Sequence, residues 1–457
     1  MVYFERFQRE VNQRAAEPMS TARLPRTQFM RCHRLTPPSK IETMKILPHF
    51  RFLFSLLAAV LLSVPVLAQV EEMRGSPAEP ADAAETRAQI AIVEKLLPQF
   101  PDRGAALYFL AASHQHLGES LEAIKLLKEC VALAEGFDPS AGPEYAGLRS
   151  SHEFTELVEK VHRDFPVEAH ARLMLVTEEK NLIPEGLAWD PNRKAFYLSS
   201  LAQKKIVQIT PDSHTSDFVP ASRDHLLPVL GIRLDPRDST VWANTGDDAG
   251  KTELVHFDSA GKLLDRFTIN DNAKRLFNDL VIRQNGEILL TDSLDNRVFR
   301  FDATRKTFSP LPTHRELFYP NGIALSADDK ILYVADAIGI IRIDLASSSS
   351  QDVRPGPHST LAGADGLYWY NNSLIAIQNG IGSPRVAAFK LSNDGTRVTK
   401  TTVLENRSSF TRLPTTGAIR GSDFYFISNS HIDNLNGDKI LDPTQLEPVR
   451  IAVVHLP

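Results

Sequence analysis

Two carboxylates and two amides recur at one position of a repeated sequence pattern. Six segments share an apolar run, a polar turn, a second apolar run and a polar end. The first residues of these segments are Glu185, Leu230, Asn278, Asn321, Asp365 and Thr416, which lie 45, 48, 43, 44 and 51 residues apart. Hard oxygen donors of this kind suit Ca²⁺, which accepts about six to eight oxygen ligands in flexible geometry, and fit thiolate-seeking metals poorly.

The elements that must position these residues are β-hairpins. The clearest segment is YPNGIALSADDKILYVAD at 319–336, in which two apolar runs flank the turn at 327–330. A repeat of about 45 residues is typical of a four-stranded propeller blade. Six repeats therefore predict a mainly β fold, a six-bladed β-propeller.

The hairpin geometry predicts where the polar residues meet. In an antiparallel hairpin, the start of the first strand and the end of the second lie at the same edge, so both sets surround one mouth of the channel. The second set is Ser199, Asn244, Asp292, Asp336, Asn379 and Asn429. The alternative is that Asn, Asp and Gly are only turn formers at strand starts, which leaves Glu185 unexplained.

The two ends of the propeller, assigned to residues 168–457, complete each other. Blade six has three strands near the C-terminus, and the alternating segment 171–177 (ARLMLVT) can supply the fourth. This pairing closes the ring and leaves no long unpaired edge. The insertion from His431 to Glu447 interrupts blade six on the side of the polar ring, and a loop of that length can serve as a lid.

The N-terminal region divides into four parts. Residues 1–43 have no sustained apolar period and are expected to be disordered or an upstream extension. Residues 44–68 have the pattern of a signal peptide, so we expect export to the periplasm or the extracellular space, with an uncleaved membrane anchor as the alternative. Residues 69–84 form a Pro- and Ala-rich linker, and residues 85–166 are predicted to be helical.

The charge and cysteine content narrow the range of partners. The formal charge of the chain is −5, and removal of residues 1–68, with ten basic and four acidic side chains, makes it −11. An acidic chain argues against nucleic acid as a partner and, after signal cleavage, against a membrane. Only Cys130 remains after cleavage, so the mature chain has no intramolecular disulfide, and Cys130 fits a buried helix position.

The helical region resembles a tetratricopeptide helix-turn-helix unit with Gly118 in the turn. A single unit cannot build the concave groove of a long array, so a docking or capping role is expected. The module could recruit a protein partner, or it could simply pack against the propeller.

Four motifs resemble the regucalcin/gluconolactonase family, also described as the senescence marker protein/gluconolactonase/LRE-like family: PEGLAWDP (184–191), FNDLVI (277–282), the segment 319–336 and ADGLYW (364–369). The paraoxonases and diisopropylfluorophosphatase are more distantly similar. The resemblance implies a divalent ion, with Ca²⁺ expected and Zn²⁺, Mn²⁺ or Mg²⁺ as alternatives. It also implies that Glu185, Asn321 and Asp365 are ligands, and that Asn278 contacts substrate or completes the metal shell.

One departure from the family concerns specificity. Gluconolactonase-like members often carry an arginine two residues before the blade-three asparagine, where this chain has Leu276. This difference puts a sugar lactone as substrate in doubt.

The favoured hypothesis is an exported metal-dependent hydrolase that opens a lactone or related ester. Asp365 or Glu185 would orient or deprotonate the attacking water, Asn278 would hold the substrate oxygen, and His431 would carry a proton unless it is an ordinary loop histidine. The main alternative is a non-enzymatic propeller that binds a ligand or a protein and has a structural ion. A third option is a metal-free propeller resembling strictosidine synthase, which two unpaired carboxylates argue against. No nucleophile-elbow context supports a Ser-His-Asp triad.

Overall fold

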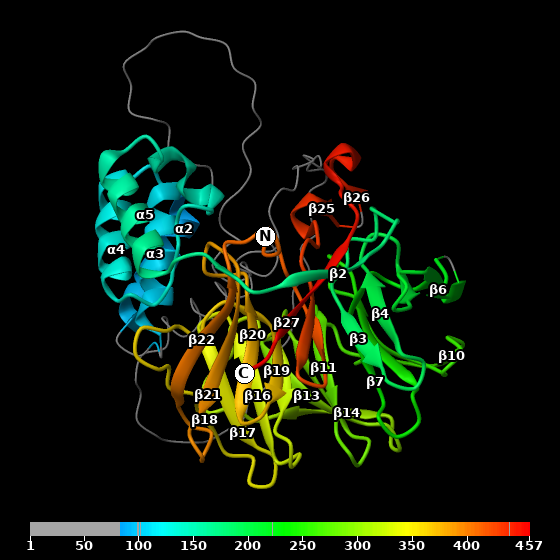
Figure 1. Cartoon of the computed structure of the whole chain (residues 1–457). Helices are drawn as coiled ribbons and strands as arrows, with labels where there is room; N and C mark the ends of the chain where they lie inside the picture. Colours follow the sequence, from blue (N-terminus) through cyan, green and yellow to red (C-terminus); the bar gives the residue numbers. More distant parts are fainter. Residues whose placement is uncertain (1–82, 98–99, 101, 222, 438) are drawn as a thin grey trace, which may run out of the picture.

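The computed structural model describes residues 83–457 except 98–99, 101, 222 and 438. The chain forms a six-bladed β-propeller with a small helical module at its N-terminal side (Figure 1), which confirms the predicted fold class. The signal segment and most of the proposed linker lie outside the described residues, so these assignments remain predictions. Among the helices of the described residues, none has the length and apolar character needed to cross a membrane.

Each of the first four blades is a consecutive antiparallel sheet of four strands. The first contains β3 (Leu187–Asp190), β4 (Ala195–Ser200), β5 (Lys205–Ile209) and β6 (Thr215–Val219). The second contains β7 (Val229–Leu234), β8 (Val241–Gly246), β9 (Thr252–Phe257) and β10 (Leu263–Phe267). The third contains β11 (Phe277–Ile282), β12 (Ile288–Asp292), β13 (Arg297–Asp302) and β14 (Thr307–Leu311). The fourth contains β15 (Ile323–Leu325), β16 (Ile331–Asp336), β17 (Gly339–Asp344) and β18 (Ser350–Asp352).

Blades five and six each include a strand from the segment that precedes blade one. Blade five contains β19 (Ala364–Tyr370), β20 (Ser373–Gln378), β21 (Arg385–Leu391) and β22 (Val398–Asn406), and β1 (Glu168–Ala169) extends its outer edge. Blade six contains β23 (Gly417–Arg420), β24 (Asp423–Ile427) and β27 (Arg450–His455). Its outer strand is β2 (Arg172–Val176), which pairs with β27 as the sequence predicts.

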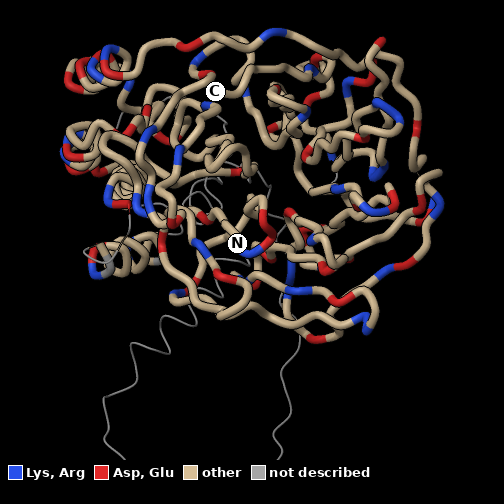
Figure 2. The backbone as a smooth tube through the Cα atoms, turned by 60° about the horizontal axis from the view of Figure 1, so that its bottom comes forward, with Lys and Arg blue, Asp and Glu red and all other residues tan. Residues whose placement is uncertain are grey.

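The core lies between neighbouring blades, because successive side chains of a strand point to opposite faces of its sheet. In β8, Val241 and Ala243 pack toward blade one, whereas Trp242 packs toward blade three with Phe267 and Phe277. Figure 2 shows the blades arranged around a central axis, with the helices along one side of the ring. Apolar contacts between blades therefore hold the inner strands around the channel.

The helical module consists of α2 (Ala83–Leu96), α3 (Arg103–His116), α4 (Ser120–Ala132), the short helix η2 (Pro143–Leu148) and α5 (His152–Asp164). Gly118 lies in the turn between α3 and α4 with φ +75°, as expected for a residue that ends a helix. Asp102 caps α3 through a 3.1 Å bond from the Ala105 N–H, and its other carboxylate oxygen accepts a hydrogen bond from Thr360 of blade five.

The module packs against blade five through an apolar core and through polar contacts. Ala362 and Ile381 belong to the same core as the helices, and the Asp138 N–H donates a 3.0 Å bond to the Ile381 carbonyl. Ser383 donates a 2.7 Å bond to the Asp138 carboxylate. Packing against the propeller, one of the two roles considered for the module, is therefore observed.

The insertion in blade six contains η4 (Ile432–Asn434), the hairpin β25 (Leu435–Asn436) and β26 (Lys439–Ile440), and η5 (Pro443–Gln445). Its Ile432 and Leu446 are buried in one cluster with Leu230 and with Ile183, Leu201 and Leu413. Leu230 lies at the start of β7, the innermost strand of blade two, so the insertion packs beside the ring of first repeat residues. Figure 1 shows the insertion and the helical module on the same side of the blades.

Candidate metal centre in the propeller channel

The first residues of the six repeats lie side by side around the channel. A Cβ built on Gly186 would overlap the carbonyl oxygen of Leu230, and one built on Gly231 would reach the carbonyl of Asn278. The Thr291 hydroxyl donates a 2.8 Å bond to the carbonyl of Asn321, which joins blade three to blade four.

The remaining contacts close this ring. A Cβ on Gly322 would overlap the carbonyl of Asp365, and the Gly366 N–H donates a 3.1 Å bond to Thr415 of blade six. The Thr416 hydroxyl then donates to the carbonyl of Glu185, which returns the ring to blade one. The small residue at the second position of most repeats is thus required by close approach of the next blade.

Two carboxylates of the ring are buried and have unpaired oxygens. Glu185 is 1% exposed and its Oε2 has no hydrogen-bond partner, and Asp365 is 4% exposed and its Oδ1 has none. Burial, followed by the negative charges of Asp365 and Asp279, raises the pKa of Glu185 well above its usual range. Burial is also the main cause that raises the pKa of Asp365 to about 7. Unpaired buried carboxylates are costly, and an opposite charge between them would remove the cost.

Amide side chains orient this pair. Asn379 donates a 2.6 Å hydrogen bond to Oδ2 of Asp365 and a 3.0 Å bond to the carbonyl of Pro414. Asn379, and to a smaller extent Asn321, lowers the pKa of Asp365 in opposition to burial. Asn278 is 1% exposed, and its Nδ2 donates a 3.0 Å bond to Ser293, which fixes the side of the amide that carries the oxygen.

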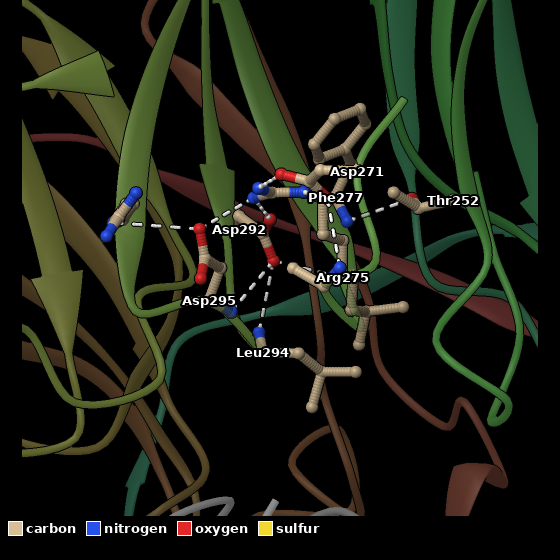
Figure 3. A network of polar contacts seen from close by, with 10 residues as sticks. Thr252, Asp271, Arg275, Phe277, Asp292, Leu294 and Asp295 are labelled. Carbon is tan, nitrogen blue, oxygen red and sulfur yellow. Dashed lines mark hydrogen bonds and ion pairs between the residues drawn. The ribbon is translucent and has the colours of Figure 1, made fainter. Parts of the chain in front are cut away.

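Blades three and four hold Asn278 and Asn321 by the same device, which sequence reasoning missed. Asp292 accepts hydrogen bonds from Arg275 at 2.9 Å and from the Leu276 N–H at 2.9 Å, directly before Asn278 (Figure 3). Asp336 accepts corresponding bonds from Arg315 at 2.6 Å and from the Phe318 N–H at 3.1 Å, shortly before Asn321. The carboxylates of both aspartates therefore anchor the segments that lead into the inner strands, and their place at the channel mouth stays a prediction.

The second set of polar residues also occupies different registers. The strand pairing places Ser199 and Asn244 opposite the small second residues of their repeats. Asp292 and Asp336 each lie one residue further along the second strand of their own blade. In blade three a bulge between Phe277 and Leu280 shifts the register, whereas blade four has no bulge and the spacing from Asn321 to Asp336 is one residue longer. Asn244 is fully buried, and neither its amide oxygen nor its amide nitrogen has a partner.

His431 is buried at the start of the insertion, with φ 56°. Its Nε2 lies 3.2 Å from Nδ2 of Asn429 and accepts a 3.4 Å hydrogen bond from the Glu447 N–H. Burial lowers the pKa of this imidazole, followed by the charge of Arg412. His431 is therefore not a solvated loop histidine: it joins the two ends of the insertion, and its role as a proton carrier stays a prediction.

A buried ion pair lies next to the ring and was also missed. Arg233 of blade two contacts Asp279 of blade three, with 2.9 Å between Nη2 and Oδ2. Its guanidinium carbon lies 5.6 Å from the ring centre of Tyr368 in blade five. Burial raises the pKa of Asp279, and the charge of Arg233 opposes this shift. The acidic second residue of the third repeat was the only sequence signal for this pair.

Within the described residues, no cluster of three or more His, Cys, Asp or Glu side chains has the arrangement of a metal site. The candidate centre instead combines two carboxylates with the amides of Asn278 and Asn321. Oxygen donors of this mixed type suit hard cations such as Ca²⁺.

Comparison with protein families supports the resemblance of the motifs. Residues 183–365 match the family model described as SMP-30/Gluconolactonase/LRE-like region. The matched region extends from the residues before blade one to the start of blade five. The match includes all four candidate ligands and ends before the insertion of blade six.

Solved structures with similar folds have different activities. A gluconolactonase from Xanthomonas campestris is similar over 60% of this chain and 86% of its own, with 14% identity and a TM-score of 0.43. An aldose sugar dehydrogenase from Streptomyces coelicolor, solved with PQQ, is similar over 62% and 96%, with 14% identity and a TM-score of 0.46. Virginiamycin B lyase from Staphylococcus aureus is similar over 63% and 99%, with 17% identity and a TM-score of 0.44. No curated protein matches the chain. Likenesses this distant do not distinguish among these activities.

Proposed function

We propose that the propeller is a metal-dependent hydrolase of the lactonase type, which opens a lactone or related ester at a divalent ion in the channel. One observation carries the proposal: Glu185 and Asp365, the first residues of two repeats, each have a buried carboxylate oxygen without a partner, and the charge of Asp365 acts on Glu185. The family match over residues 183–365 supports a lactonase-like propeller in particular.

The residues present fit such an ion. Glu185, Asn278, Asn321 and Asp365 would hold it, with Ca²⁺ as the expected ion and Zn²⁺, Mn²⁺ or Mg²⁺ as the alternatives. When bound, a divalent ion supplies a Lewis acid that polarises a carbonyl oxygen. The two unpaired carboxylates explain why a cation is needed, since together they would otherwise favour protonation.

The side chains of the site have separate roles in binding the substrate, orienting the water and transferring a proton. Asn278, fixed by Ser293, holds the substrate oxygen. Glu185 or Asp365 orients the attacking water or accepts its proton, and Asn379 holds Asp365 in a single orientation for this purpose. His431 is the proposed proton carrier for the leaving group, at the base of the insertion.

Substrate access requires movement of the insertion. Ile432 and Leu446 pack onto Leu230 at the channel mouth, and the ring carboxylates below are almost fully buried. We therefore assign the insertion as a lid, with His431 at its hinge.

The test is hydrolysis of a panel of lactones and aryl esters by the purified chain, before and after chelation and with Ca²⁺ restored. Turnover that disappears with chelator and returns with metal supports the proposal. Metal-independent turnover that survives in both Glu185→Gln and Asp365→Asn contradicts it.

The burial of the ring favours a second candidate, a non-enzymatic binding propeller with a structural ion. Structural ions are commonly enclosed, and here the carboxylates are 1% and 4% exposed. This candidate predicts a melting temperature that depends on the metal without turnover of any panel member. Export and recruitment of a protein partner by the helical module remain further proposals, tested by fractionation and by affinity capture with the module deleted.

A further inference from the structure

A salt bridge and an aromatic contact together span the channel. Arg233 belongs to the innermost strand of blade two, and Tyr368 belongs to the innermost strand of blade five. These blades stand opposite each other in a ring of six, so the 5.6 Å contact between the guanidinium and the ring crosses the channel axis. The Tyr368 hydroxyl accepts a 2.6 Å bond from the Gly417 N–H of blade six, which fixes the far end.

The contact between Arg233 and Tyr368 lies directly beside the candidate metal ligands. Asp279, the anionic partner of Arg233, follows Asn278 in the chain, and its Oδ1 accepts a 2.8 Å bond from the Leu280 N–H. The carboxylate is 1% exposed, and its charge acts on both Glu185 and Asp365. Arg233 is thus the cationic member of a buried group with three carboxylates.

When all three carboxylates are ionised, the group that they form with Arg233 carries a net charge of minus two. One divalent ion neutralises such a group, whereas one monovalent or trivalent ion does not. Without Arg233, the same ring would carry three negative charges. In a buried site the Coulomb energy of one unit charge at several Å is large enough to change which ion binds best.

We propose that Arg233 is a fixed cation of the channel and, paired with Asp279, determines that the ring selects a divalent ion. It acts as a positioning and specificity-determining residue and does not contact the metal. This inference rests on the metal site assigned under the proposed function.

The experiment compares Ca²⁺ and Tb³⁺, ions of similar size and different charge, by competition titration of the purified chain. Arg233→Met should raise the preference for Tb³⁺ over Ca²⁺ by roughly tenfold or more, the order expected for one unit charge at an effective dielectric constant of about 20. Asp279→Asn should shift the preference toward Ca²⁺ by a similar factor. The double variant Arg233→Met with Asp279→Asn restores two net negative charges and should have the wild-type ratio.

Two controls separate charge from structure. Arg233→Lys keeps the positive charge but loses the planar fork, so its Tb³⁺/Ca²⁺ ratio should stay within about twofold of wild type. If the guanidinium were only a structural brace, this variant would change as much as Arg233→Met. Arg237→Met removes the same charge at an outer turn of the same blade, where Arg237 pairs with Asp235, and should leave the ratio unchanged.

The outcomes distinguish the two proposals. A wild-type chain that binds neither ion overturns the metal site and this inference together. A wild-type chain that binds Ca²⁺, with an unchanged ion ratio in Arg233→Met, overturns this inference alone. If Arg233→Met fails to fold, Asp279→Asn and the double variant decide: the same ratio in Asp279→Asn as in wild type contradicts the role of Arg233 and Asp279.

Discussion

Asn379 donates a 2.6 Å hydrogen bond to Oδ2 of Asp365 and leaves Oδ1 of the same carboxylate without a partner. The amide is itself held by the carbonyl of Pro414, so Asp365 is fixed from a neighbouring strand and from the next blade. This arrangement fixes the orientation of the carboxylate and leaves one of its oxygens available to a ligand. Side chains that orient a metal ligand typically change metal affinity by about ten- to a hundredfold when they are removed.

Asn379→Ala should therefore weaken Ca²⁺ binding by roughly tenfold or more, because Asp365 loses the bond that orients it. Isothermal titration of the purified chain measures this change. Asn372→Ala is the matched control, since Asn372 lies in the turn between β19 and β20 of the same blade and donates a 3.1 Å bond to the carbonyl of Leu391 at the end of β21. Equal affinities of both variants and wild type would contradict the positioning role of Asn379.

Glu185→Gln and Asp365→Asn should stabilise the metal-free chain. The folded-state pKa of Asp365 is raised to about 7, so ionisation of this carboxyl costs stability as the pH rises from about 4 to 7. A neutral amide avoids this cost, and we expect a gain of about 1–3 kcal/mol in the free energy of unfolding in chelator at pH 8. Both variants should also lose the stabilisation that wild type gains from Ca²⁺.

Urea unfolding with and without Ca²⁺ checks both effects. Glu129→Gln on α4 serves as a control for charge removal, because this glutamate is 45% exposed and should have little effect. Lower stability of Glu185→Gln and Asp365→Asn in chelator would show that the carboxylates have partners even without metal.

Gly382→Ala should loosen the contact between the helical module and blade five. A Cβ at this position would overlap the carbonyl oxygen of Asp138 and lie 2.8 Å from the Tyr108 hydroxyl. We expect a loss of about 2–4 kcal/mol, typical of steric strain and a positive φ combined.

Gly421→Ala is a matched control that measures the cost of a positive φ without a steric overlap. Gly421 has φ +63°, compared with +89° at Gly382, but a Cβ at Gly421 would meet nothing within 4 Å. Calorimetry measures the difference. A similar loss in both variants would mean that the contact at Gly382 contributes little to docking.

The stability of the chain should also decrease as the pH rises, because of Glu135. This residue lies at the start of the loop that docks onto blade five. Burial, followed by the charge of Asp102, raises the pKa of Glu135 to about 8. A carboxyl with a raised folded-state pKa contributes stability below its unfolded pKa, near 4.5, and this contribution is lost as the pH rises toward 8.

The variant Glu135→Gln should therefore have a smaller decrease in melting temperature between pH 5 and pH 8.5 than wild type. Thermal melts at matched ionic strength across this range measure the difference. Parallel pH profiles for the two proteins would mean that Glu135 is ionised without cost in the folded chain.

The sequence predicts the fold because each blade carries its own periodic signal. Alternating apolar runs and turn residues recur at about 45 residues, and the unpaired strand at 171–177 has an obvious partner in the incomplete last blade. The inner residues Glu185, Asn278, Asn321 and Asp365 follow from the same repeat, since they occupy equal positions in equivalent hairpins. The helices at 103–116 and 120–132 follow from 3.6-residue periodicity.

The remainder of the site depends on contacts between blades, which a repeat does not encode. Arg233 and Tyr368 are 135 residues apart, and nothing in either local sequence indicates that they meet across the channel. The roles of Asp292 and Asp336 were missed because the spacing of residues within a repeat does not reveal which arginine each carboxylate meets. His431 looked like an exposed loop residue because its burial depends on the apolar cluster beneath the insertion.

The pairing of β2 with β27 has a consequence for how the protein is made. Arg172 pairs with Val453, so the edge of a strand that is synthesised before the first blade is covered only after β27 (Arg450–His455) has been made. Contacts of such long sequence separation slow folding, and unpaired edges are open to association with other chains. During translation, the edge of β2 is therefore exposed until β27 has left the ribosome. A nascent chain that stalls before residue 450 would keep an open ring, and chaperones that shield strand edges would act at this stage.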